Sequence, residues 1–169
     1  MRFILRTGRL VAQLCLLAAS SGLAADWPQW RGPEENGVSS ERLPDQPDFS
    51  HLLWQKKVGT GFSAVAVVGN RVFTLGHNGS KQDGAETVWC LDAQTGSEIW
   101  RQSYAAPLID RFYEGGPGAT PTVRGGRVFT YSKHGRLHCY EAATGKSVWQ
   151  RDMLAEAGLT ARDLLDQQN

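Results

Sequence analysis

The sequence predicts an all-β fold: part of a β-propeller with two four-stranded antiparallel blades, an additional outer strand and a C-terminal helical tail. Three observations predict it. The tetrapeptide Arg-Val-Phe-Thr occurs twice, at residues 71–74 and 127–130. A run from cysteine to tryptophan also occurs twice, at residues 90–100 and 139–149. Trp54, Trp100 and Trp149 are spaced by 46 and 49 residues, which is the length of a propeller blade made of four short strands.

Each repeat contains four strand-like runs that are bounded by turn residues. In the first repeat they span residues 63–68, 71–75, 87–91 and 98–102. Gly69-Asn70 suits a tight hairpin between the first two runs. In the second repeat they span residues 119–124, 127–132, 136–140 and 147–151. An antiparallel sandwich is the alternative fold, but it gives no reason for a repeated Thr-Gly-x-x-x-Trp.

The N-terminus has the pattern of a secretory signal peptide. Residues 1–24 contain three arginines, then an apolar run of about ten residues that is too short to span a bilayer, then small residues. A membrane anchor or a buried helix is the alternative. Cleavage of this segment predicts a secreted, periplasmic or cell-envelope protein, with no membrane span left.

The remaining chain divides into three segments. Residues 25–50 are expected to be an extended N-terminal segment, residues 51–152 the propeller blades, and residues 153–169 a helical tail or insertion. Apolar residues at helical spacing predict the tail: Leu154, Ala157, Ala161, Leu164 and Leu165. Gly158 interrupts this pattern, and Thr160 with Asp163 resembles a second helix cap.

The charge balance argues against nucleic acid as a partner. The full chain has 18 basic and 17 acidic residues, and loss of the three N-terminal arginines leaves 15 and 17. No basic patch remains to attract nucleic acid or anionic lipid. Two cysteines also remain, Cys90 and Cys139, at the same position of the two repeats. Equivalent positions in neighbouring blades are expected to be too far apart for a disulfide, so we expect buried free thiols.

The repeated turn and tryptophan have a structural interpretation. A glycine in the turn permits a positive φ and the close approach of another group. The tryptophan four residues later can lie across the junction between blades, where its burial contributes about 2–3 kcal/mol. Carboxylates and threonine hydroxyls can bond the turn amides. The blade-docking residues on this interpretation are Trp54, Asp92, Thr95, Gly96, Trp100, Glu141, Thr144, Gly145 and Trp149.

At these residues the chain resembles the pyrroloquinoline-quinone-like (PQQ-like) β-propeller repeat family, whose docking motif is Ala-x-Asp-x-x-Thr-Gly-x-x-x-Trp. Residues 90–100 match this motif with cysteine for alanine. Residues 139–149 match it with cysteine for alanine and glutamate for aspartate. The runs at 26–33 and 115–123 also resemble exported bacterial members. The family includes quinoprotein dehydrogenases and non-enzymatic members, among them the scaffold lipoprotein of outer-membrane assembly.

The resemblance implies two functions. The first is a non-catalytic exported scaffold or binding module, which presents propeller loops to protein partners or envelope components and needs no cofactor. The alternative is a fragment of a PQQ-dependent alcohol or sugar dehydrogenase. Such dehydrogenases typically have a vicinal Cys-Cys pair, Ca²⁺ ligands and a catalytic aspartate. The chain has no adjacent cysteines and no recognisable calcium loop, so no catalytic, cofactor or metal residue is carried over. PQQ and Ca²⁺ are expected only under the alternative.

The linker between the blades carries a candidate ligand or partner face. Arg111, Tyr113 and Glu114 lie in a segment that is expected to cross one face of the propeller near its central channel. A glycine-rich crossover that merely covers a blade edge is the favoured structural alternative.

Two other motifs are interpreted as structural. His134 and His138 are four residues apart, but one falls in a turn and the other on a strand, which argues against a metal pair. The run at 78–80, Asn-Gly-Ser, fits a glycosylation acceptor, and we interpret it as a loop turn.

The number of repeats predicts an incomplete propeller. Trp54 closes one blade whose other strands are missing, two blades follow, and related propellers need several more to close. We therefore expect a truncated copy of a larger protein, whose unpaired blade edges favour association when the chain is expressed alone.

Overall fold

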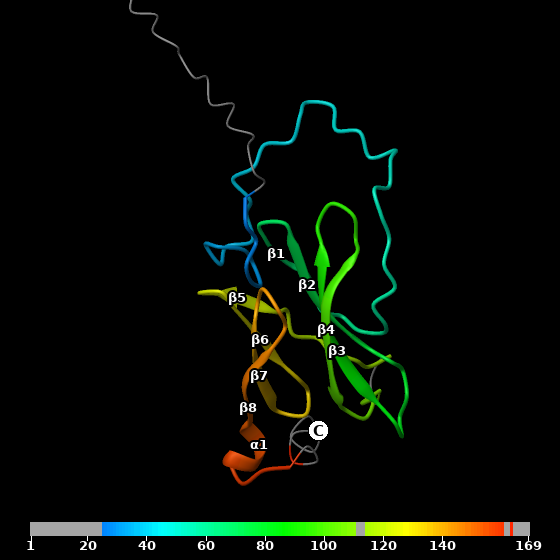
Figure 1. The fold of residues 1–169 in the computed structure, drawn as a ribbon, viewed down its shortest axis with the longest axis vertical. Helices are drawn as coiled ribbons and strands as arrows, with labels where there is room; N and C mark the ends of the chain where they lie inside the picture. Colours follow the sequence, from blue (N-terminus) through cyan, green and yellow to red (C-terminus); the bar gives the residue numbers. More distant parts are fainter. Residues whose placement is uncertain (1–24, 111–113, 161–162, 164–169) are drawn as a thin grey trace, which may run out of the picture.

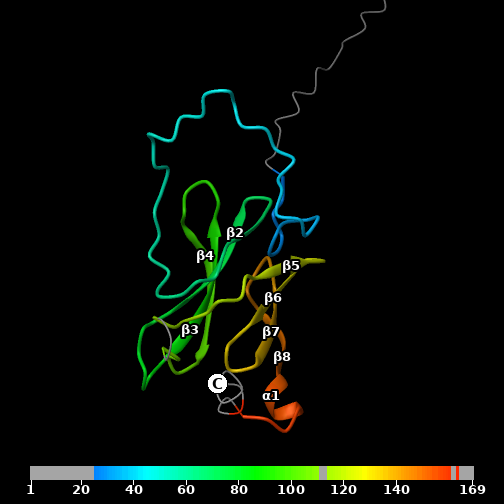
Figure 2. The ribbon, with the colours of Figure 1, turned by 180° about the vertical axis from the view of Figure 1, so that it is seen from behind.

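The computed structural model describes residues 25–110, 114–160 and 163 of the 169-residue chain. The expected signal peptide lies outside the described residues. Two four-stranded antiparallel sheets are present, as the sequence predicts, with strand orders β1-β2-β3-β4 and β5-β6-β7-β8. Each sheet is a meander formed by one continuous stretch of chain, and the two lie side by side (Figures 1 and 2).

The eight strands agree with the sequence patterns in order and place. The first blade contains β1 (Ala66–Val68), β2 (Arg71–His77), β3 (Ala85–Asp92) and β4 (Glu98–Ala105). The second contains β5 (Thr122–Arg124), β6 (Arg127–Tyr131), β7 (Arg136–Glu141) and β8 (Ser147–Asp152). Strands β1 and β5 are shorter than predicted. The residues before β1 have other partners, since the Phe62 amide donates to the Pro117 carbonyl at 2.8 Å.

The same backbone irregularity occurs in both blades. In the first blade Cys90 pairs with Trp100, whereas the next residue, Leu91, pairs with Glu98. The second blade shows the same register shift directly after Cys139. Such a β-bulge leaves one residue of the outer strand unpaired and increases the local twist. The repeat seen in the sequence is therefore also a repeat of backbone register.

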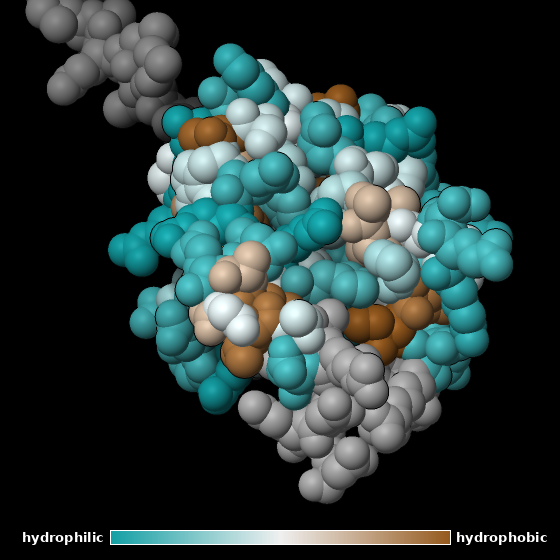
Figure 3. All heavy atoms as spheres, turned by 90° about the horizontal axis from the view of Figure 1, so that it is seen from below, coloured by the Kyte–Doolittle hydropathy of each residue, from teal (hydrophilic) through white to brown (hydrophobic). Residues whose placement is uncertain are grey.

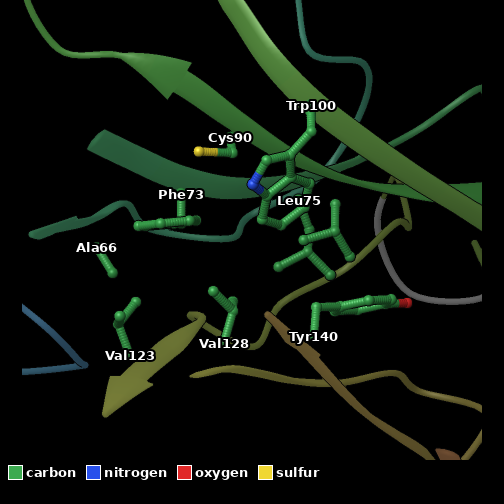
Figure 4. Close-up of a cluster of buried hydrophobic side chains, with 9 residues drawn as sticks. Ala66, Phe73, Leu75, Cys90, Trp100, Val123, Val128 and Tyr140 are labelled. Atoms are coloured by element: carbon green, nitrogen blue, oxygen red, sulfur yellow. The ribbon is translucent and has the colours of Figure 1, made fainter. Parts of the chain in front are cut away.

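The hydrophobic core lies between the two blades rather than within either of them. The first blade contributes Ala66, Phe73, Leu75, Val88, Cys90 and Trp100, and the second contributes Val123, Val128 and Tyr140. In Figure 4 these side chains converge from two sheets on a common space. Because removal of apolar surface from water is the main favourable term in folding, the two blades stabilise each other.

The N-terminal segment joins the inner strands of both blades. Trp27 and Val67 of β1 exchange two backbone hydrogen bonds, at 2.7 and 2.9 Å. The amide of Val123 in β5 donates to the Pro28 carbonyl at 2.8 Å. Residues 38–53, cyan in Figure 1, then follow as a long arm without helix or strand.

The expected outer strand around Trp54 is not a strand. Residues 51–59 have no regular secondary structure, and Thr60 forms an isolated bridge with His77 at the end of β2. This segment packs across the first sheet instead of pairing along an edge. A Cβ placed on Gly76 would overlap the Val58 carbonyl oxygen at 1.8 Å, and the Trp89 indole nitrogen donates to that same oxygen at 3.1 Å.

The predicted helical tail is described only in part. Helix α1 (Met153–Glu156) begins after Asp152, whose carboxylate accepts the Ala155 amide hydrogen bond at 3.0 Å. It ends before Gly158, which has a φ of 68°. Beyond it, the backbone amide and hydroxyl of Thr160 both donate to Asp163, as expected for a second cap. Ala161, Leu164 and Leu165 of the predicted apolar face lie outside the described residues. No helix in the described part of the chain is long and apolar enough to cross a membrane.

Candidate functional site

Trp54 and Trp100 each pack on the next Thr-Gly turn along the chain. The Trp54 ring lies so close to Gly96 that a Cβ there would stand 2.5 Å from ring atom Cδ2. The Trp54 indole nitrogen also donates to the Ala93 carbonyl at 2.9 Å. Gly96 has a φ of 67°, so two separate constraints require glycine at this position.

Trp100 makes the same two contacts one repeat later. A Cβ on Gly145 would stand 2.6 Å from Trp100 Cδ2, and the indole nitrogen donates to the Ala142 carbonyl at 3.0 Å. The ring also lies 5.9 Å from the Phe73 ring and 6.2 Å from the Tyr140 ring. Trp100 therefore contacts the core and the neighbouring turn at once.

The carboxylates of the two turns bond differently. Asp92 accepts the backbone amide of Thr95 at 2.8 Å and its hydroxyl at 3.0 Å, and these bonds lower the pKa of Asp92. Glu141 accepts the Thr144 hydroxyl at 2.9 Å and pairs with Arg127 at 3.4 Å. The hydroxyl bond is the first cause of its lowered pKa. The longer glutamate side chain thus replaces the bond to the turn amide with an ion pair.

The third docking tryptophan, Trp149, has no turn against it in the described residues. Its ring lies 6.0 Å from that of Phe129, and 39% of the residue is exposed. Trp100, at the equivalent position, is only 7% exposed. The two residues therefore share a sequence motif but differ in environment.

A polar cluster at the blade junction was not found from the sequence. Glu86, only 2% exposed, accepts the Tyr104 hydroxyl at 2.6 Å. The Tyr104 ring stacks on His138 of the second blade, with 4.2 Å between ring centroids. Burial, and then the charge of Glu86, raise the pKa of Tyr104. Glu86 falls between the strand-like runs predicted at 71–75 and 87–91, so no pattern marked it as buried.

His138 is a buried histidine at the blade junction. Burial, followed by the nearby charge of Arg136, lowers its pKa, and its Nδ1 has no hydrogen-bond partner among the described residues. His134 bonds the Pro107 carbonyl at 2.9 Å through Nε2. The two histidines thus have different partners, since His138 stacks on Tyr104 and His134 bonds a backbone carbonyl.

Both cysteines are buried free thiols, as expected. Burial raises the pKa of Cys90 to about 11, and it raises that of Cys139 as well. Cys90 faces the junction between the blades, whereas Cys139 is cross-strand from Phe129 and Trp149, on the other face of the second sheet.

The Asn78 side chain is engaged within its own loop. Its amide nitrogen donates to the Asp83 carbonyl at 2.8 Å, and its oxygen accepts the amides of Ser80 and Ala85. The structural interpretation of this Asn-Gly-Ser run therefore has a physical basis, since the Asn78 amide bridges the two ends of the loop.

The candidate face in the linker is only partly described. Arg111 and Tyr113 lie outside the described residues, and Glu114 is exposed. The two following glycines, both with a φ of 81°, pack so tightly that a Cβ would meet the carbonyl oxygen of Ile109 or of Thr60 at 2.5 Å. The linker therefore folds against the segment that precedes β1.

The two cysteines and the possible metal ligands of the described residues are dispersed. Cys90 and Cys139 lie in different blades. Across residues 25–110, 114–160 and 163, no three His, Cys, Asp or Glu side chains gather closely enough to hold a metal ion.

Comparison with known families agrees with this geometry. Residues 84–164 match the model of a PQQ-like repeat family described as "Outer membrane protein assembly factor BamB". This segment is a PQQ-like β-propeller repeat region. It contains the docking turns of both blades and two of the three docking tryptophans. Among curated proteins, none matches the chain significantly.

Several solved structures are similar to this propeller region. BamB from Moraxella catarrhalis is 20% identical, with 59% of this chain and 26% of that chain covered and a TM-score of 0.41. A quinohemoprotein alcohol dehydrogenase from Comamonas testosteroni is 23% identical, with 79% and 20% covered and a TM-score of 0.48. A europium-containing methanol dehydrogenase is 22% identical, with 52% and 14% covered and a TM-score of 0.39. The chain thus spans about a quarter or less of the length of these proteins.

Proposed function

We propose that this propeller region acts as a non-catalytic scaffold of the bacterial cell envelope, which binds protein partners through its loops. The observation that carries this proposal is the arm at residues 38–53. It holds five large apolar side chains in water: Val38, Leu43, Phe49, Leu52 and Leu53. Phe49 is 79% exposed and Leu53 is 83% exposed. Single exposed apolar residues are normal on a protein surface, but five in one short segment are more than such scatter explains and favour a protein interaction site.

The arrangement of the polar residues supports a binding role. The repeated carboxylates, threonines and tryptophans are occupied in docking the blades, as in the bonds of Asp92 to Thr95 and of Trp100 to Ala142. On the face seen from below, hydrophobic surface is broken into small areas between hydrophilic residues (Figure 3). The arm, which lies at the opposite end in Figure 1, is therefore the favoured binding segment.

The envelope location is supported by two observations. The N-terminal 24 residues have the composition of an export signal. The family description names an outer membrane protein assembly factor. In the periplasm, the proposed scaffold would bind envelope proteins, and this binding requires neither nucleic acid nor a cofactor.

Site-specific photo-crosslinking in the bacterium that encodes the chain tests this proposal. The photoreactive residue p-benzoyl-phenylalanine is placed at position 49 or 53, and at position 146 as a control, since Lys146 is exposed in a blade turn. We expect a discrete cross-linked envelope protein from positions 49 and 53 but not from 146. Equal labelling at all three positions, or none, would contradict the proposal. Substrate-dependent dye reduction by the purified chain with PQQ and Ca²⁺ would overturn the non-catalytic assignment.

A further inference from the structure

The residues between the N-terminal bridge and the arm form a compact loop, residues 29–37, which we call the N-terminal loop. Its base is fixed to both blades, because Trp27 pairs with Val67 of β1 and the Pro28 carbonyl accepts the Val123 amide of β5. In Figures 1 and 2 this blue segment lies beside β1 and β5. The loop therefore has a defined position relative to the two inner strands.

Hydrogen bonds within the N-terminal loop hold its conformation. The Gln29 side-chain amide donates to the Gly32 carbonyl at 3.3 Å and to Glu35 Oε1 at 3.0 Å. The Gly37 amide donates to the Arg31 carbonyl at 2.8 Å. Arg31 and Glu35 have φ values of 65° and 54°, a region that side-chain-bearing residues rarely adopt and that concentrates at ligand-binding sites.

Trp30 is exposed although its backbone is held in place. The residue is 66% exposed, whereas the neighbouring Trp27 packs its ring against Gly32, where a Cβ would stand only 2.7 Å from the ring. An indole that stays in water contributes little to the stability of the fold, because the stabilisation comes from burial of its apolar surface. Within the described residues, Trp27 is therefore packed against the fold and Trp30 is not.

Trp30 borders a cavity whose other walls are polar. The cavity has a volume of about 370 Å³ and is lined by Gln29, Trp30, Arg31, Glu35 and Thr122. It is within the size range of small-molecule sites. One guanidinium and one carboxylate cancel, so the lining has no net charge that would select an ion. Among the described residues, Glu35 uses Oε1 for Gln29 and Arg31 uses Nη2 for the Asn36 carbonyl, which leaves further donors and acceptors on both side chains.

An aromatic face beside a neutral set of hydrogen-bonding groups matches the chemistry of a sugar ring. A pyranose presents C–H groups on its face and hydroxyls at its edge. C–H groups interact favourably with the electron-rich face of indole, while Arg, Glu, Gln and Thr side chains supply donors and acceptors for hydroxyls. We propose that the N-terminal loop is a carbohydrate-binding site, in which Trp30 stacks on a hexose ring and Arg31 and Glu35 bond its hydroxyls. This inference does not depend on the proposed scaffold function.

Titration of the full chain with three neutral tetrasaccharides, namely cellotetraose, maltotetraose and chitotetraose, tests the proposal by calorimetry and by saturation-transfer NMR. We expect at least one to bind saturably, with a Kd on the order of 1 mM or below. Trp30→Ala should weaken that binding at least about tenfold. Phe62→Ala, which removes another exposed aromatic side chain outside both the cavity and the arm, should leave the affinity unchanged.

Two further measurements separate a sugar from a charged ligand. Glu35→Gln keeps an oxygen for the Gln29 amide, so a neutral sugar should still bind, whereas a cation would lose its counter-charge. The affinity for a neutral sugar should also be insensitive to salt concentration, because a neutral ligand forms no ion pair that salt could screen. The proposal is overturned if no tetrasaccharide saturates, or if Trp30→Ala binds as tightly as the unaltered chain. Circular dichroism of Trp30→Ala verifies that the variant is folded.

Discussion

Replacing Trp100 by alanine removes the ring that joins the two blades. The residue is 7% exposed, its ring lies near Phe73 and Tyr140, and its indole nitrogen bonds the Ala142 carbonyl. Truncation of a buried tryptophan to alanine typically costs about 3–5 kcal/mol. The lost hydrogen bond is part of that cost, at about 0.5–1.5 kcal/mol. We therefore expect Trp100→Ala to lower the free energy of unfolding by about 4 kcal/mol.

Trp149 provides a matched control with the same residue type at the same position of the motif. It is 39% exposed, and its aromatic contact in the described residues is with Phe129. An aromatic pair contributes about 0.5–1.5 kcal/mol beyond burial, and the partial burial of the ring adds about 1 kcal/mol, so Trp149→Ala should cost about 2 kcal/mol. The two variants should therefore differ by about 2 kcal/mol, because Trp100 is more deeply buried and has the additional contacts with the neighbouring turn.

Urea unfolding of the 169-residue chain, followed by far-ultraviolet circular dichroism, measures this difference. With m-values of about 1–3 kcal/mol per molar urea, the midpoint of Trp100→Ala should fall at least about 0.7 M below that of Trp149→Ala. If Trp100→Ala does not fold at all, Trp100→Phe, which keeps an aromatic ring and loses the bond to Ala142, gives an intermediate value. Equal destabilisation by Trp100→Ala and Trp149→Ala would refute the blade-junction role of Trp100.

Three further predictions concern titration and reactivity. Burial of Cys90, which raises its pKa to about 11, should make its alkylation near pH 8 much slower in the folded chain than in urea; peptide mass mapping measures this, and equal rates would contradict it. The pKa of Asp92 is lowered by the amide of Thr95, so its stabilising effect is present above about pH 4 and is lost as pH falls through its folded pKa. Asp92→Asn should flatten that acid dependence of the unfolding midpoint, and an unchanged slope would argue against the turn bonds. Burial lowers the pKa of His138, so the free energy of unfolding should fall as pH drops below about 6.5. His138→Phe should therefore weaken the dependence of the urea unfolding midpoint on pH in this range, and an unchanged dependence would contradict the prediction.

Most of the fold could be predicted from the sequence repeat. Arg-Val-Phe-Thr and Thr-Gly-x-x-x-Trp located all eight strands, because a strand pair and its turn are specified by nearby residues. The prediction of a strand around Trp54 was wrong, because strand pairing depends on which other segment lies beside it in the fold, and local sequence does not specify that. Here the backbone of residues 54–60 packs across the sheet, against Gly76 and Trp89.

The polar cluster and the candidate sugar site depend on contacts between distant residues. Glu86 meets Tyr104 across two strands, and Tyr104 meets His138 across two blades. Trp27 and Trp30 are three residues apart in one short run, and no local pattern indicates that one is packed and the other exposed. Such differences arise from tertiary packing, which composition and spacing do not encode.

The docking of a tryptophan on the next Thr-Gly turn is tested most directly by two glycine variants. Gly145 and Gly126 both have a φ of 71°, so alanine brings the same backbone strain, about 1–2 kcal/mol, at either position. A Cβ on Gly145 would stand 2.6 Å from Trp100, whereas a Cβ on Gly126 would meet no atom within 4 Å. We expect Gly145→Ala to lower the free energy of unfolding by at least about 2 kcal/mol more than Gly126→Ala, because it also displaces a buried ring. Equal losses in the two variants would contradict the docking of Trp100 on this turn.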